Sequence, residues 1–364
     1  MNNGKRKVGA AGRSIRRTLI IVLALCLTTA PFVSGCGESG GSAGEVNVYN
    51  WADYIDPDVV EMFEEETGIK VNYFEFQSNE ELYSLMRMGS SSADIIIPSD
   101  YTVARLIAED MLEELDFSNI PNYSLIDGSF KNLDYDPDGL YSVAYMVGTV
   151  GLIYNTAMIT GDFTSWSALF DEQYAGQIVM FDNPRDAFGV ALKYLGYSQN
   201  TTSEAEIREA FDLLLKQKPL VHAYVMNQIF FKLESGEAAL GPYYAGDYLA
   251  MYEQNNDLVF THPVEGTNYF VDTMCIPKDA GNKKNAEIFI NFMCRTDIAL
   301  LNMAEIMYAS ANYEAAEEFA DELEPWQYEI MFASDEVLAK SEVFTHLPED
   351  ILAMYDQLWI ELKR

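Results

Sequence analysis

The sequence predicts an α/β protein of two lobes, connected by segments of the chain that cross from one lobe to the other. Three observations lead to this prediction. The part of the chain after the N-terminal leader holds a little over 300 residues, which is long for one simple core. Strand and helix patterns alternate along it in two separate regions. A strand-like passage through Gly148 and Gly151 connects those regions.

The first 35 residues read as a bacterial lipoprotein signal peptide. Basic residues and no acidic one come before an apolar run at 18–30, which is too short to span a bilayer. The run VSGC at 33–36 follows and resembles a lipobox, so we expect lipidation at Cys36. The alternative is plain secretion, which would leave Cys36 a free thiol. Residues 36–45 then form the lipidated cysteine and a small, polar, flexible tether.

The first alternating region begins near Val46. Strands are expected at 46–50, 69–76 and 93–99, the last with the continuous apolar run typical of a parallel sheet. Helices are expected from Pro57 to Gly68 after an Asp56 cap, from a Ser78–Glu81 capping box to Met88, and over 101–110. This order predicts an open parallel sheet with helices on both faces.

The second region follows the strand-like passage at 141–154, which we interpret as the first crossing between lobes. Strands are expected at 177–182, 238–244 and 268–277, the last as the return crossing, and helices at 187–195, 204–216 and 246–254. An amphipathic helix at 282–295 and further helices close the chain. We therefore expect lobe 1 to comprise 46–148 plus 273–316, and lobe 2 to comprise 149–272 plus 317–364.

The composition is strongly acidic. The chain has 23 basic and 57 acidic residues, and without the six basic residues of the leader the net charge is −40. Nucleic acid is therefore excluded as a partner, whereas a cationic solute is favoured on encounter. Cys275 and Cys294 lie in apolar runs, as two buried free thiols or as a disulfide. The three widely spaced histidines indicate no metal site, and no cofactor motif is present.

Aromatic and acidic residues follow the strands at the points where ligands bind in open α/β sheets. Carboxylates at these ends would accept hydrogen bonds from ammonium groups, and the rings would contact the cations and pack against methylenes, for roughly 0.5–2 kcal/mol per contact. Only Arg185 adds a positive charge. The pattern favours an extended organic cation. The residues of this set are Trp51, Asp53, Tyr54, Ser99, Asp100, Tyr101, Asp182, Asn183, Asp186, Tyr243, Tyr244, Asp247, Phe270 and Asp272.

Several of these residues also have a purely structural interpretation. Asp53 can belong to a turn, Asp247 can cap a helix, and Asp186 can pair with Arg185. Asp272 lies inside an apolar strand, where a buried charge needs a partner. The functional interpretation therefore rests on the joint placement of the set.

Residues 46–364 resemble the spermidine/putrescine-binding proteins of bacterial ABC importers. The matching segments are VNVYNWADYI, ETGIKVNYFEFQSNEELY, ADIIIPSDY, TSWSALF, LKYLGYS, YYAGDY and VDTMCIPKDAGNKKNAEIFINFM, in the same order along the chain. The resemblance implies a periplasmic-binding-protein-like type II fold that closes over a linear polyamine. It also implies ABC permease subunits with their ATPase as partners. Together with the lipobox at Cys36, it leads us to expect a lipid-anchored monomer on the outer face of the cytoplasmic membrane.

Carried over by position, the resemblance implies ligand contacts from Trp51, Asp53, Tyr54, Ser99, Tyr101, Asn183, Asp186, Tyr244, Asp247, Phe270 and Asp272. Asp247 matches an acid of putrescine-type members. The chain departs from the family at Tyr244, where the family has a tryptophan, and at Asn183, where it has a carboxylate. A family glutamine near the C-terminus has no clear counterpart at 345–350.

Three other functions are compatible with parts of the sequence. Adjacent Tyr243 and Tyr244 could bind ferric ion as phenolates. Paired carboxylates could cleave glycosides, although no catalytic motif sets one acid apart as the proton donor, so we expect no enzyme. A sensor that binds the same ligand would look identical in sequence. The expected function is capture of putrescine or spermidine for an importer.

Overall fold

The computed structural model describes residues 44–89 and 91–364. The predicted signal peptide (1–35), the predicted lipidation site at Cys36 and most of the tether therefore lie outside the described residues. Within them, no helix has the length and apolar character needed to cross a membrane. Strand β1 (Glu45–Trp51) begins one residue before the predicted start.

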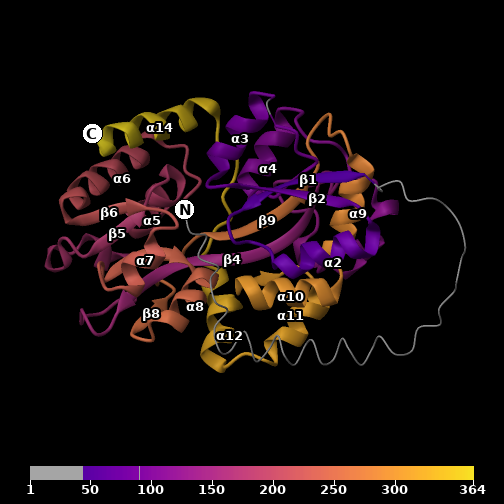
Figure 1. The fold of residues 1–364 in the computed structure, drawn as a ribbon. Helices are drawn as coiled ribbons and strands as arrows, with labels where there is room; N and C mark the ends of the chain where they lie inside the picture. Colours follow the sequence, from indigo (N-terminus) through magenta and orange to yellow (C-terminus); the bar gives the residue numbers. More distant parts are fainter. Residues whose placement is uncertain (1–43, 90) are drawn as a thin grey trace, which may run out of the picture.

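One mixed sheet of ten strands runs through the described molecule (Figure 1). Its eight-strand path is β2 (Lys70–Phe76), β1, β3 (Ile95–Ile96), β9 (Tyr269–Cys275), β4 (Ser142–Asn155), β7 (Leu240–Tyr244), β5 (Ile178–Phe181) and β6 (Val221–Val225). The remaining strands, β8 (Leu258–Thr261) and β10 (Ala309–Ser310), pair with β4.

The parallel sheet expected for the first alternating region is confirmed for the strands of that region. β1 is parallel to β2 and β3, and β5 is parallel to β6 and β7. The long strands β4 and β9 are antiparallel to each other, and β4 is also antiparallel to β7. This follows from the chain running out along β4 and returning along β9, which matches the predicted pair of crossings.

The helices of the first region follow the predicted caps. Asp56 accepts from the Asp58 N–H at the start of α2 (Pro57–Thr67), and Gly68 ends that helix in the left-handed conformation that glycine favours. Ser78 accepts from the Glu81 N–H to start α3 (Asn79–Arg87), but the Glu81 carboxylate accepts from Gln77 rather than from Ser78. α4 (Asp100–Ala108) completes this region.

The helices of the second region flank the opposite half of the sheet. They are α5 (Pro184–Leu195), α6 (Glu204–Gln217), α7 (Ile229–Glu234) and α8 (Ala245–Gln254). α5 begins three residues before the predicted start because Asn183 caps it and Pro184 occupies its first position. This earlier start places Arg185 and Asp186 in the first helical turn.

The C-terminal helices pack on both halves of the sheet. They are α9 (Lys283–Met293), α10 (Thr296–Ile306), α11 (Tyr313–Ala320), α12 (Pro325–Met331), α13 (Asp335–Leu338) and α14 (Glu349–Lys363). α10 contacts α2 and α9, whereas α14 contacts α5 and α6 (Figure 1). Short 3₁₀ helices occur at 117–119, 121–125, 128–130, 166–170, 172–174 and 218–220. Cys275 and Cys294 are both buried and free, so the disulfide alternative is wrong.

Candidate functional site

A cavity of about 630 Å³ opens where the strands end, and all eleven predicted ligand-binding residues line it. Its walls come from the end of β1, the starts of α3, α4, α5 and α8, the middle of β9 and the segment around β10. The predicted residues therefore converge from segments that are far apart in the sequence. Their placement was predicted because strand ends of one sheet meet at one edge.

Asp272 lies in the middle of the cavity wall on β9 and is only 4% exposed. Its carboxylate accepts hydrogen bonds from the Ser99 hydroxyl at 2.6 Å and from the Tyr54 phenol at 2.7 Å. Burial raises its pKa to about 6, although both hydrogen bonds favour the charged form. Ser99 occupies the N-cap position of α4 without capping it through its side chain, because its hydroxyl is directed to Asp272.

Asp186 forms a second buried acidic position in the first turn of α5. It accepts from the Tyr244 phenol at 2.8 Å and from the Asn183 side-chain amide, while its own N–H is capped by Asn183. Burial raises the pKa of the Asp186 carboxyl, and these two side-chain bonds oppose the shift. Asp186 forms no ion pair with Arg185 among the described residues, so pairing with Arg185 does not explain this acid.

Asp247 lies in the third position of α8, and Tyr244 rather than Asp247 is the N-cap residue. The helix-capping interpretation of Asp247 is therefore wrong. Its carboxylate accepts from the phenol of Tyr308 at 2.9 Å. The Tyr308 ring packs closely against Gly246 and Gly148. A Cβ atom added at either glycine would come within 3.0 Å of a ring carbon, so both positions require glycine. Sequence analysis missed Tyr308, whose partners lie about 60 residues or more away along the chain.

Aromatic rings make up much of the remaining wall. The Trp51 ring lies 4.6 Å from that of Phe76, Tyr54 lies 5.5 Å from Tyr308, and the Tyr244 ring meets Phe270 nearly edge-on at 5.6 Å. These contacts fix the faces that can contact an alkyl chain or a cation.

Two side chains complete the rim of the cavity. Asp53 has a φ of 53°, a left-handed conformation that aspartate tolerates, and it lies in the turn after β1. The Tyr101 phenol at the start of α4 donates to Glu80 of α3 at 3.1 Å. The turn interpretation of Asp53 is thus correct for its backbone, and its side chain still lines the cavity.

The sequence pattern missed several acidic and aromatic residues of the lining. Asp100 was marked at its strand end but not expected to contact ligand. It is fully buried, burial raises its pKa to about 8, and it accepts from the N–H groups of Tyr101 and Val271. The others not foreseen include Glu80, Glu234, Glu253, Glu305, Tyr308 and Phe344. Of these, only Glu80 has a local signal, beside the Ser78 cap.

The lining is acidic throughout its described part. Nine carboxylate residues contribute to it, and no lysine, arginine or histidine does, among the residues that the structure describes. Such a cavity suits a cation with an apolar stem. The ferric alternative is disfavoured because the Tyr244 phenol donates to Asp186, which together with burial raises its pKa well above the usual value. Within 44–89 and 91–364, no group of three or more acidic, histidine or cysteine side chains is arranged to hold a metal.

Comparison with known proteins confirms the resemblance. The chain is 34% identical over 284 residues to the spermidine/putrescine-binding periplasmic protein of Escherichia coli K12, covering 77% of this chain and 82% of that protein. It is 30% identical over 360 residues to the putrescine-binding periplasmic protein SpuD of Pseudomonas aeruginosa, covering 93% and 97%.

A solved structure described as a putative spermidine/putrescine ABC transporter from Listeria monocytogenes superimposes with a TM-score of 0.82. It is 36% identical, and the match covers 88% of this chain and 98% of that one. The model of the bacterial extracellular solute-binding protein family matches residues 58–333. The match spans most of the described residues, including the predicted site residues from Ser99 to Asp272. This chain therefore belongs to the family of bacterial extracellular solute-binding proteins.

Proposed function

We propose that the protein is the substrate-binding component of a polyamine ABC importer and captures putrescine or spermidine in the cavity. The observation that carries the proposal is the lining itself, in which Asp272 and Asp186 are buried carboxylates set among aromatic rings without a neighbouring cationic lining residue in the described part. Relatives named as spermidine/putrescine-binding and putrescine-binding proteins support the same ligand class.

The side chains suggest how a linear polyamine is held. Asp272, supported by Asp186, accepts hydrogen bonds from one ammonium group, and Asp53 with Asp247 binds the other. Trp51, Tyr54, Tyr244 and Phe270 then pack against the alkyl chain. Charge-assisted hydrogen bonds are roughly twice as strong as neutral ones, and water is displaced from a largely buried site. This arrangement favours ligands whose two ammonium groups are separated by the distance between the acidic positions, and it disfavours anions.

The wider biological setting belongs to the same proposal. The two lobes, 46–148 plus 273–316 and 149–272 plus 317–364, close about the β4 and β9 crossings, and the closed monomer docks on permease subunits coupled to an ATPase. Lipidation of Cys36 holds the protein at the outer face of the cytoplasmic membrane. The protein delivers its ligand unchanged and performs no catalysis.

Calorimetric titration tests the ligand class directly. A soluble form of residues 37–364 contains every helix and strand that the structure describes, and it is titrated with putrescine, cadaverine, spermidine and spermine at moderate salt. We expect micromolar or tighter binding of at least one of them, with lysine and ferric citrate silent. Silence across all four amines would overturn the proposal, and a response to ferric citrate alone would point to metal transport.

A further inference from the structure

We infer that Arg185 is a specificity residue that repels any additional ammonium group extending past Asp186 and so limits the ligand at that end of the cavity. The inference rests on the proposed function. It goes beyond that function by assigning a repulsive element to one end of a cavity that is otherwise lined with acids.

Arg185 is a buried cation without an ion-pair partner among the described residues. It is 4% exposed, and within the described residues the guanidinium makes one hydrogen bond, from Nη2 to the side-chain oxygen of Asn200 at 3.2 Å. Its Nε and Nη1 groups have no partner within the described part of the chain. A buried charge is costly to fold, and burial lowers the pKa of this guanidinium.

The guanidinium lies behind the wall of the cavity. Its central carbon is 4.5 Å from the centre of the Phe344 ring and 5.6 Å from that of Tyr101, and both of these rings line the cavity. Tyr355 packs against it at 5.7 Å, on the side of α14. An ammonium on the cavity side of Phe344 would lie roughly 8–10 Å from this charge, given usual cation–ring distances.

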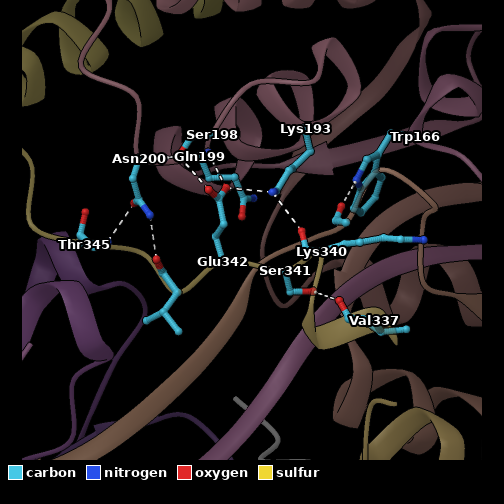
Figure 2. Close-up of polar contacts among 12 residues, drawn as sticks. Trp166, Lys193, Ser198, Gln199, Asn200, Val337, Lys340, Ser341, Glu342 and Thr345 are labelled. Carbon is cyan, nitrogen blue, oxygen red and sulfur yellow. Dashed lines mark hydrogen bonds and ion pairs between the residues drawn. The ribbon is translucent and has the colours of Figure 1, made fainter. Parts of the chain in front are cut away.

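A polar network holds the backbone on both sides of Phe344. Figure 2 shows Asn200 and Thr345, which belong to this network. Asn200 binds both neighbours of Phe344, since it donates to the Val343 carbonyl at 2.8 Å and accepts from the Thr345 N–H at 2.9 Å. The same Asn200 oxygen receives the hydrogen bond of Arg185. The guanidinium and the aromatic wall are therefore positioned by one side chain and keep a fixed distance.

Figure 2 also shows how the preceding residues are secured. The Glu342 carboxylate accepts from Ser198 and Gln199, each at 2.8 Å, and pairs with Lys193 at 2.9 Å. The Glu342 backbone exchanges hydrogen bonds with Thr267 and Tyr269, which precede and begin β9. The wall in front of Arg185 is thus tied to the sheet, and an elongated ligand cannot displace it easily.

Two ligands of equal length separate charge from size. Spermidine and N-butylputrescine have chains with the same number of non-hydrogen atoms. In N-butylputrescine a methyl group takes the place of one terminal ammonium group of spermidine. Removing the charge in Arg185→Met should strengthen the binding of spermidine relative to that of N-butylputrescine. We expect the ratio of the spermidine Kd to the N-butylputrescine Kd to fall at least tenfold, which is consistent with the repulsion between two charges roughly 9 Å apart near a protein surface.

Two control variants complete the test. Arg185→Lys keeps the charge and should leave the ratio within twofold. Arg105→Gln removes a cation that lies 3.5 Å over Tyr83, outside the cavity, and should also leave it unchanged. Melting temperatures verify folding, and Arg185→Gln replaces Arg185→Met if the latter is unfolded. If the folded neutral variant of Arg185 leaves the ratio of the two Kd values unchanged, the inference is overturned. If the unmodified protein does not bind putrescine, the proposed function is overturned instead.

Discussion

Replacing Asp272 by asparagine removes one negative charge from the centre of the cavity and keeps the shape of the side chain. Asp272 is 4% exposed and held by Ser99 and Tyr54, so a polyamine ammonium that binds it is taken out of water together with it. Removing one partner of a buried charge pair costs about 3–5 kcal/mol. In the proposed arrangement Asp186 supports the same ammonium, so we take the lower limit, which corresponds to a roughly 150-fold weaker Kd.

Calorimetry with putrescine measures this loss, and thermal unfolding separates it from damage to the fold. The ligand-free variant should melt within a few degrees of the unmodified protein, because asparagine can still accept one of the two hydroxyl hydrogen bonds. Asp182→Asn is the matched control, since that carboxylate pairs with Lys363 at the surface and does not line the cavity. An Asp272→Asn variant that binds putrescine within threefold of the unmodified protein would refute the assignment of Asp272 as an anchor.

The remaining predictions concern pH, packing and anchoring. Because the pKa of Asp272 is raised to about 6, polyamine affinity should fall as this carboxyl protonates below pH 6, by up to about tenfold per pH unit, with proton release on binding that calorimetry in two buffers detects. Gly246→Ala places a Cβ 2.5 Å from the Tyr308 ring, so it should disrupt the Tyr308–Asp247 bond and weaken putrescine binding about tenfold, whereas Gly128→Ala, with open space around it, should have no effect on the Kd. Cys36→Ser should move the protein from the membrane fraction to the soluble fraction, and retention at the membrane would contradict lipid anchoring.

Local sequence patterns predicted the elements that carry their own signals. The Asp56 cap, the proline after it and Gly68 define α2 almost to the residue. The predicted binding residues Trp51 and Asp186 meet in one cavity because they follow strands of one sheet that end at the same edge. Patterns of this kind act over a few residues. They predict the position of a side chain correctly where the sheet topology brings the ends of the strands together.

The features that sequence reasoning missed depend on contacts between distant segments. The register of β9 against β4 follows from pairing residues more than 100 positions apart, which no local period reveals. Tyr308 enters the cavity after Met307 ends α10 with a φ of 59°, an uncommon conformation for a non-glycine residue. Phe344 does so because Asn200 binds its neighbours.

The cavity holds groups that are unfavourable for folding and favourable for binding. The Ser99 hydroxyl donates to Asp272 and does not cap α4. Burial raises the pKa values of Asp272 and Asp100, which favours the neutral form of both acids. A dication that enters the cavity stabilises the ionised carboxylates. The free energy lost by burying these acids is thereby partly offset on binding. Burial raises the pKa of Asp272, and a bound ammonium would favour its charged form. Both the polyamine affinity and the upward pKa shift should therefore decrease in any variant that exposes this carboxylate to water.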